Sequence, residues 1–277
     1  MKKHLPSLEI DVNQVRHTLV DFLRTEITRA GFQRGVVGLS GGLDSTLACL
    51  LAAEALGPEN VLAVRMPFRT SSPESLEHAA LVIQQTGVQT VTIPITPMAD
   101  LFLASIPESQ TVRRGNVLAR LRMIVLYDRS AEFKGLVIGT GNKTEIYLGY
   151  TTLFGDSACA LNPIGDLYKT QVRQLARAMG VPEVILAKPP SADLWPGQTD
   201  EGELGFTYAR VDQLLTLLVD GGCTPDACVE AGFDRAFVQA VVDRIHRNEF
   251  KRLPAPIGRL MPQRASEDTA TRKLRRS

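Results

Sequence analysis

The stretch GVVGLSGGLDSTLACLLAAEAL, residues 35–56, decides the fold class, because a glycine-rich turn joins two apolar segments in it. The run GVVGL is short, apolar and flanked by glycine, which is typical of a buried strand. The segment STLACLLAAEAL has a helical composition and ends at GPEN, residues 57–60. The turn between them has two interpretations: Asp44 or Ser45 simply caps the helix, or the turn binds phosphate groups.

The same alternation of strand and helix continues toward the middle of the chain. The expected strands cover 61–67, 89–95 and 135–140, and the expected helices cover 12–30, 72–87 and 116–133. A Ser-x-x-Glu pattern at Ser71–Glu74 predicts a capping box for the second of these helices. This alternation favours an α/β fold, a doubly wound parallel sheet with helices on both faces.

The C-terminal part of the chain has a different pattern, because no strand is expected beyond residue 166. The expected helices there cover 167–180, 207–219 and 234–248. Two polar stretches, 104–115 and 187–205, are expected to be loops, the second of them lid-like. We expect one domain over 1–277, with a core at 12–257, a helical C-terminal elaboration, and a flexible basic tail at 258–277.

Composition and charge narrow the function classes. The 277 residues are 44% hydrophobic and 22% charged, an ordinary globular mix that buries a core without disulfides. A net charge of +1 creates no overall field that attracts nucleic acid or a membrane surface. No segment has the pattern of a membrane span or a signal peptide, so we expect a cytoplasmic protein. The four cysteines lack metal-ligand spacing, so a zinc site is not expected.

The position of the glycine-rich turn favours the phosphate interpretation. Parallel α/β sheets bind ligands at the carboxyl ends of their strands, where the next helix presents free N–H groups. Gly41 and Gly42 let the backbone approach an anion, and Ser40 and Ser45 add hydroxyl groups. The turn lacks the GK[ST] ending of a Walker A loop. Asp44 would repel phosphate unless a divalent cation lay between them, and Mg²⁺ suits this ligand set.

The segment SGGLDS after a strand resembles the pyrophosphate-binding loop of the N-type ATP pyrophosphatases, which activate a substrate by adenylation. Further segments occur in the order found in NAD synthetases: NVLARLRM at 116–123, GTGNKTE at 139–145, GYTTLFGD at 149–156, YKTQV at 168–172, PPSADLWPGQTDEGELG at 189–205 and NEFKR at 248–252. The resemblance covers roughly residues 12–257. It implies an adenine nucleotide alpha hydrolase-like fold, a homodimer, and ATP-dependent amidation of deamido-NAD by ammonia through an adenylated intermediate, with AMP and pyrophosphate as products.

The resemblance also implies which residues form the site. ATP would contact Gly38, Leu39, Ser40, Gly41, Gly42, Leu43, Asp44, Ser45, Arg65, Thr140, Lys169 and Ser191. Deamido-NAD would contact Asn116, Arg120, Glu145, Asp156 and Lys251. Mg²⁺ would be held by Asp44, with Glu145 as a second carboxylate or as a dinucleotide contact. No protein nucleophile is expected, so catalysis would rest on positioning and electrostatics.

Ordinary structural roles remain open for several of these residues. Without the resemblance, Lys169 is best interpreted as a solvated lysine in the first turn of a helix. Arg120 and Arg122 can equally form an exposed helix face. Thr140 and Glu145 can be capping residues of a short helix.

The sequence departs from the family pattern at three positions. Leu153 and Ala160 stand where the short ammonia-using enzymes usually carry a lysine and an aspartate, and Phe250 stands where a histidine is common. At these positions the chain resembles the synthetase domain of glutamine-dependent NAD synthetases, but the match leaves no room for a glutaminase domain. Two alternatives follow: a synthetase subunit fed ammonia by a separate glutaminase, and another amide ligase of the superfamily.

Overall fold

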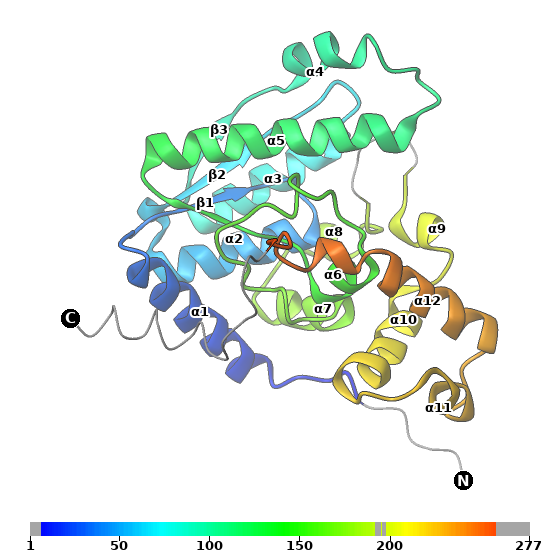
Figure 1. The fold of residues 1–277 in the computed structure, drawn as a ribbon. Helices are drawn as coiled ribbons and strands as arrows, with labels where there is room; N and C mark the ends of the chain where they lie inside the picture. The colour runs from blue at the N-terminus through cyan, green and yellow to red at the C-terminus, as the bar shows by residue number, and fades with distance from the viewer. Residues whose placement is uncertain (1–6, 192–194, 196–197, 259–277) are drawn as a thin grey trace.

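Four parallel strands form the centre of the computed structural model, which describes residues 7–191, 195 and 198–258 (Figure 1). The strands are β1 (Gly35–Gly38), β2 (Val61–Arg65), β3 (Gln89–Thr92) and β4 (Leu136–Ile138). Their order in the sheet is β3-β2-β1-β4, and each neighbouring pair is parallel. The carboxyl ends of the strands therefore lie along one edge of the sheet.

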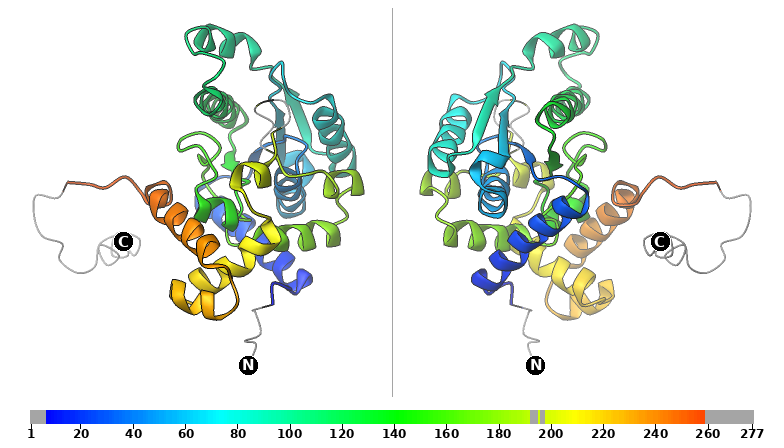
Figure 2. Two further views of the ribbon diagram at one scale, coloured as in Figure 1. Left: turned by 90° about the vertical axis from the view of Figure 1, so that its right-hand side faces the viewer. Right: turned by 90° about the vertical axis from the view of Figure 1, so that its left-hand side faces the viewer.

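Helices cover both faces of this sheet, because alternate strand residues point in opposite directions (Figures 1 and 2). Val37 and Ala63 belong to the core on one face, and Val36 and Val64 belong to the core on the other. The first face is covered by α1 (Val12–Arg29), α2 (Leu43–Leu56), α3 (Pro73–Thr86) and α7 (Lys169–Ala178). The second face is covered by α4 (Thr96–Leu103) and α5 (Thr111–Phe133). The predicted α/β fold class is confirmed.

The C-terminal helices form an apolar cluster of their own, to which Leu148, Tyr168 and Val211 contribute. Its elements are α6 (Lys143–Leu148), α9 (Asp200–Leu204), α10 (Tyr208–Leu215), the π-helical turn η2 (Thr216–Asp220), α11 (Pro225–Glu230) and α12 (Arg235–Arg247). The remaining short elements are η1 (Pro58–Asn60), α8 (Glu183–Leu186) and η3 (Glu249–Lys251). Helix α10 contacts both α6 and α7, so this layer lies against two helices that begin at the edge of the sheet.

Several local expectations were wrong. The stretch 104–115 is not a loop throughout, because α5 already begins at Thr111 and Gly115 is buried inside it. The long loop 187–205 contains the short helix α9. The capping box at Ser71 does not form, since the helix begins at Pro73 after Ser72. The Ser71 hydroxyl instead accepts a hydrogen bond from the amide of Phe68 at 3.1 Å.

The two remaining expectations concern the basic C-terminal tail and membrane-spanning helices. The predicted basic tail lies outside the described residues from position 259 onward. None of the helices in the described ranges combines the length and the hydropathy of a membrane span.

Candidate active site

The turn between β1 and α2 is shaped by its own glycine and serine residues. Gly41 has a φ of +81°, and a Cβ at this position would lie 2.1 Å from the carbonyl oxygen of Ser75. Only glycine fits there without displacing the start of α3. The hydroxyl groups of Ser40 and Ser45 lie 3.0 Å apart. The Gly42 amide donates to Ser40 at 3.2 Å, and its carbonyl accepts from Ser45 at 3.0 Å.

The first turn of α2 has no side-chain cap. Gly42 occupies the N-cap position, the Ser45 hydroxyl bonds within the turn, and the Asp44 carboxylate bonds to residues of α6 and α7. The interpretation that Asp44 or Ser45 simply caps this helix is therefore wrong. A helix N-terminus that lacks a side-chain cap is a favourable place for an anion.

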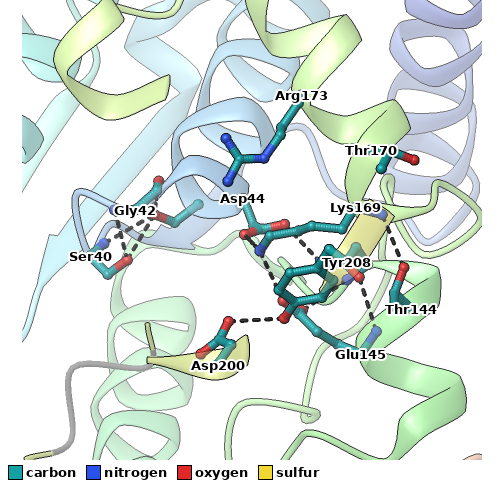
Figure 3. Close-up of polar contacts among 12 residues, drawn as sticks. Ser40, Gly42, Asp44, Thr144, Glu145, Lys169, Thr170, Arg173, Asp200 and Tyr208 are labelled. Carbon is teal, nitrogen blue, oxygen red and sulfur yellow. Dashed lines mark hydrogen bonds and ion pairs between the residues drawn. The ribbon is translucent and has the colours of Figure 1, made fainter. Parts of the chain in front are cut away.

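Asp44, Lys169 and Glu145 form a charged cluster beside this turn (Figure 3). Lys169 Nζ lies 2.5 Å from Asp44 Oδ2 and 3.1 Å from Glu145 Oε1. Asn142 Nδ2 donates to Asp44 Oδ1 at 2.9 Å. Asn142 and Glu145 also form a reciprocal capping box at the start of α6. Glu145 therefore caps a short helix, as one interpretation had it, and also faces the buried ammonium group.

Burial and the neighbouring charges together set the pKa values of Lys169 and Glu145. Lys169 is 2% exposed, so its interpretation as a solvated surface lysine is wrong. Burial by itself lowers the pKa of Lys169, but the negative charges of Asp44 and Glu145 outweigh it and the pKa is raised. Burial raises the pKa of Glu145 to about 8, although the charge of Lys169 lowers it in part. The lysine is thus held in its charged form between the two carboxyl groups.

Asp212 of α10 is fully buried and joins the first turns of α6 and α7. Its Oδ1 accepts from the Thr144 hydroxyl at 2.6 Å, and its Oδ2 accepts from the Thr170 amide at 2.8 Å. The Thr144 hydroxyl oxygen accepts in turn from the amide of Lys169 at 3.0 Å. Burial raises the pKa of Asp212, and these hydrogen bonds oppose the rise. Asp212 was not among the predicted site residues, because it belongs to none of the recognised motifs.

A second polar group, from α9 and α10, borders the cluster (Figure 3). Lys169 Nζ lies 5.2 Å from the ring centroid of Tyr208, whose hydroxyl donates to Asp200 Oδ2 at 2.9 Å. The Tyr150 hydroxyl donates to Glu203 at 3.0 Å. Burial raises the pKa values of Asp200 and Tyr208. The acidic run TDEGELG in the expected lid was the sequence signal for this group, but no role was predicted for its individual residues.

One cavity of about 1060 Å³ is lined by Asp44, Glu145 and Lys169 and by Asp200 and Glu203 of the neighbouring polar group. Its lining includes these predicted ATP contacts: Gly38, Leu39, Ser40, Gly42, Leu43, Asp44, Ser45, Arg65, Thr140, Lys169 and Ser191. It also includes the predicted dinucleotide contacts Asn116, Glu145, Asp156 and Lys251. Gly41 is absent from the lining because it is buried against α3. Arg120 is exposed and lies in a separate shallow hollow of about 620 Å³.

The predicted dinucleotide contacts hold one loop, residues 149–156. Asn116 Oδ1 accepts from the Thr152 hydroxyl at 2.7 Å. Asp156 accepts from the Thr152 amide at 2.8 Å and from the Thr151 hydroxyl at 2.6 Å. Lys251 Nζ donates to two carbonyl oxygens of the loop, at 2.7 and 2.8 Å. These side chains therefore fix the shape of the cavity wall in addition to lining it.

Three positively charged side chains that were not among the predicted contacts also line the cavity. Arg122, Arg173 and Lys188 all line it. Arg173 lies four residues after Lys169 on α7, and its side chain extends toward the β1–α2 turn (Figure 3). This four-residue spacing was a signal that the two cations share one helix face. The predicted Arg65 contributes a buried Nε that has no hydrogen-bond partner within the described part of the chain, as expected for a group awaiting an anion.

Comparison with known proteins gives a consistent result. The family described as NAD synthase matches residues 15–255. The NH(3)-dependent NAD(+) synthetase of Trichlorobacter lovleyi is 55% identical over 245 residues, which cover 88% of this chain and 90% of that protein. The solved NH3-dependent NAD synthetase of Campylobacter jejuni is 33% identical, with a TM-score of 0.77 over 90% of this chain and 100% of that one. The solved NMN synthetase of Francisella tularensis is 34% identical, with a TM-score of 0.79 over 90% and 99%.

Proposed function

The chain belongs to the NAD synthase family, and from this premise we infer that it is an ammonia-dependent NAD synthetase. The enzyme uses ATP to activate the nicotinate carboxyl group of deamido-NAD and then forms the amide with ammonia, releasing AMP and pyrophosphate. One observation carries the assignment of this chemistry to the cavity. A buried lysine between two carboxylates lies beside a helix N-terminus that has no side-chain cap.

The residues of this chain would reduce the electrostatic barrier of the first step. A carboxylate nucleophile and a triphosphate repel each other, so positive charge and N–H groups must be in place before they meet. We assign the triphosphate to the turn from Gly38 to Ser45, where the open end of α2 supplies N–H groups. Lys169 and Arg173 lie on the same side and would neutralise phosphate oxygens.

Asp44 and Glu145 fit the hard oxygen ligands that Mg²⁺ takes up beside a nucleotide. Mg²⁺ usually binds through one or two carboxylates together with phosphate oxygens. The described residues contain no group of three His, Cys, Asp or Glu side chains that would hold a metal without the nucleotide, which agrees with a shared site. When bound, Mg²⁺ would neutralise phosphate charge and polarise the phosphorus centre. In the protein alone, the Lys169 ammonium group contacts both carboxyl groups.

The dinucleotide would occupy the part of the cavity beside the 149–156 loop. Asn116, Asp156 and Lys251 are the polar groups that support this assignment, because they line the cavity there. Arg120 would reach the dinucleotide only from the neighbouring hollow, which it shares with Asn116. Orientation of the nicotinate carboxyl group toward the α-phosphorus is the main contribution expected from these side chains.

Free ammonia is the nitrogen donor that best fits the relatives, whose names specify NH(3)-dependence. The departures at Leu153, Ala160 and Phe250 therefore do not by themselves indicate a glutamine-fed subunit. A separate glutaminase stays an alternative, and it is tested by replacing ammonium with glutamine in the assay and then adding a glutaminase.

The solved NMN synthetase supports a second candidate, amidation of nicotinate mononucleotide. Its identity to this chain is 34%, compared with 55% for the NAD synthetase of Trichlorobacter lovleyi. We therefore expect a higher kcat/KM for deamido-NAD than for nicotinate mononucleotide. A higher kcat/KM for the mononucleotide would reverse the assignment.

The direct test is an assay of the purified protein with ATP, Mg²⁺, deamido-NAD and ammonium. Equal amounts of NAD, AMP and pyrophosphate are expected. Omission of ammonium should stop NAD formation, and glutamine alone should not restore it. A protein that is folded by circular dichroism but forms no NAD under these conditions would refute the proposed function.

We further propose a cytoplasmic homodimer. The exposed apolar side chains of Leu101, Phe102 and Val112, which are 86%, 59% and 66% exposed, support a partner surface on α4 and α5. A cytoplasmic location suits an enzyme that consumes ATP. Light scattering during gel filtration would measure the mass, and a monomer at micromolar concentration would contradict the dimer.

A further inference from the structure

Helix α6 ends against side chains from the last helices of the chain. Three carbonyl groups at its end and one just beyond accept hydrogen bonds from four side chains of α12, η3 and the residues that follow each of these elements. We call these four side chains the C-terminal clamp. Arg252 donates to Tyr147 at 3.1 Å; Arg244 and Asn248 donate to Leu148 at 3.1 and 3.2 Å; Lys251 donates to Gly149 at 2.7 Å and to Thr151 at 2.8 Å.

The charges of the clamp match the end of the helix that they meet. The last carbonyl groups of a helix have no partner within it, and the helix dipole makes this end negative. Three of the four clamp side chains are cations. Burial lowers the pKa values of Arg244 and Lys251, so these cations are held partly away from water. The guanidinium of Arg252 also lies 4.9 Å from the ring centroid of Tyr147.

Besides forming hydrogen bonds, the clamp packs closely against the end of α6. Gly149 ends α6 with a φ of +64°, and a Cβ at this residue would lie 2.2 Å from the Cβ of Asn248. Any larger residue at position 149 would push α12 away from the end of α6. The opposite end of α6 is held by Asp212, which accepts from Thr144. A carboxylate thus faces the positive end of the helix and cations face its negative end.

Helix α6 carries one member of the charged cluster, Glu145, and its N-cap residue binds another. Its capping residue Asn142 bonds to Asp44, and Glu145 bonds to Lys169. We propose that the C-terminal clamp is a positioning device for Glu145. Through α6 it fixes the carboxylate against Lys169, and through Gly149 and Thr151 it fixes the 149–156 loop. The expected effect of the clamp on the reaction rests on the proposed function. The structural link from the clamp through α6 to Glu145 does not.

Arg252 gives the cleanest test of this link, because it bonds to α6 but does not line the cavity. It also donates to the carbonyl of Ile245 in α12 at 3.3 Å, so an effect of its removal on the reaction must pass through the two helices that the clamp joins, α6 and α12. Arg247 is the matched control: it lies on the last turn of α12, is exposed, and has no polar partner for its side chain among the described residues. Each substitution to methionine removes one positive charge from the same segment.

The first measurement is hydrogen–deuterium exchange of the ligand-free protein. The amides of Gly149 and Tyr150 bond to carbonyls of α6, so their exchange reports how firmly the end of the helix is held. Arg252→Met should speed exchange in residues 146–151 by about tenfold, the loss expected for one charged hydrogen bond. Arg247→Met should leave it unchanged. Equal exchange in Arg252→Met and the wild type would overturn the proposal, whether or not the protein makes NAD.

The second measurement is the kinetics of NAD formation, which must first be shown for the wild type. Arg252→Met should raise the Mg²⁺ activation constant or the KM for deamido-NAD by severalfold, and Arg252→Lys should restore part of the loss. In a Glu145→Gln background the same substitution should have a smaller effect, because the positioned group is gone. A lower Tm with unchanged kinetic constants would show a purely structural clamp and overturn the positioning role. A wild type without NAD formation would instead refute the proposed function.

Discussion

Removal of the Lys169 side chain tests the charged cluster most directly. In Lys169→Met, Asp44 and Glu145 lose the ammonium group that lies 2.5 and 3.1 Å away. Removing one partner of a buried ion pair costs about 3–5 kcal/mol. The two carboxylate side chains are 18% and 16% exposed, so water recovers part of this loss. We expect a fall of about 2–4 kcal/mol in the free energy of unfolding, or about 4–16 °C in Tm.

The pH dependence of this loss follows from Glu145. Its folded pKa of about 8 already lies above the ordinary 4.5, so this group favours folding less as pH rises from 4.5 to 8. Lys169 lowers that pKa, so its removal raises the folded value further. The wild type and the variant then differ in proton binding only above pH 8. There the variant should lose up to about 1.4 kcal/mol more for each pH unit.

Urea denaturation at pH 7 and pH 9.5 measures both parts of the prediction. Arg177→Met is the control, because it removes an exposed charge from the last turn of the same helix. The additional substitution Glu145→Gln should restore part of the stability of Lys169→Met. Equal stability of Lys169→Met and the wild type at both pH values, or a smaller difference at the higher pH, would refute the electrostatic argument.

Three further substitutions test the surroundings of the cluster. Asp44→Asn should abolish pyrophosphate release while leaving the circular dichroism spectrum intact; near-normal turnover would contradict its role with Mg²⁺. In Asp212→Asn, the new amide NH₂ group would face either the Thr144 hydroxyl or the Thr170 amide, both of which donate to Asp212, so one hydrogen bond is lost. The free energy of unfolding, measured with urea, should fall by about 1–3 kcal/mol. Gly41→Ala should destabilise the fold by about 1–3 kcal/mol because of its positive φ and the contact with Ser75. Gly42→Ala, whose Cβ would meet only Ser40 Oγ at 3.3 Å, should cost much less, and equal losses would argue against strain at Gly41.

The sequence predicted the sheet well, because β1, β2 and β4 are short apolar runs closed by a glycine-rich or polar turn. The remaining strand, β3, is polar and mostly exposed. It also predicted both Asp44 and Lys169 as ATP contacts, and the structure brings these two side chains together although they lie 125 positions apart. That prediction depended on the family motifs, since spacing alone made Lys169 a surface residue. The start of α5 was misjudged because Gly115 and its polar neighbours suggest a loop, while burial of Gly115 in the folded chain favours the helix.

The polar residues that support the site were the hardest to predict. Asp212 lies in an otherwise amphipathic helix, and only the packing of α10 against two other helices shows what its carboxylate contacts. Lys251 was recognised as part of the NEFKR motif, but its partners are backbone carbonyls, which leave no pattern in the sequence. Tertiary contacts to main-chain atoms are therefore the part of this site that sequence patterns do not reveal.

The acceptors of the C-terminal clamp are all main-chain oxygens, whereas its donors are all side chains. The clamp therefore places no demand on exposed loop side chains such as Phe154. Close packing still requires glycine at Gly149 and Gly155, and the side chains of Thr152 and Asp156 hold the loop through their own hydrogen bonds. On the proposed assignment of the dinucleotide to this loop, substrate preference can then diverge through the loop without change to the proposed ATP site beside it. Variant libraries that aim at a new dinucleotide or mononucleotide substrate should accordingly randomise the exposed loop positions and leave the loop glycines, Thr152, Asp156 and the four clamp residues untouched.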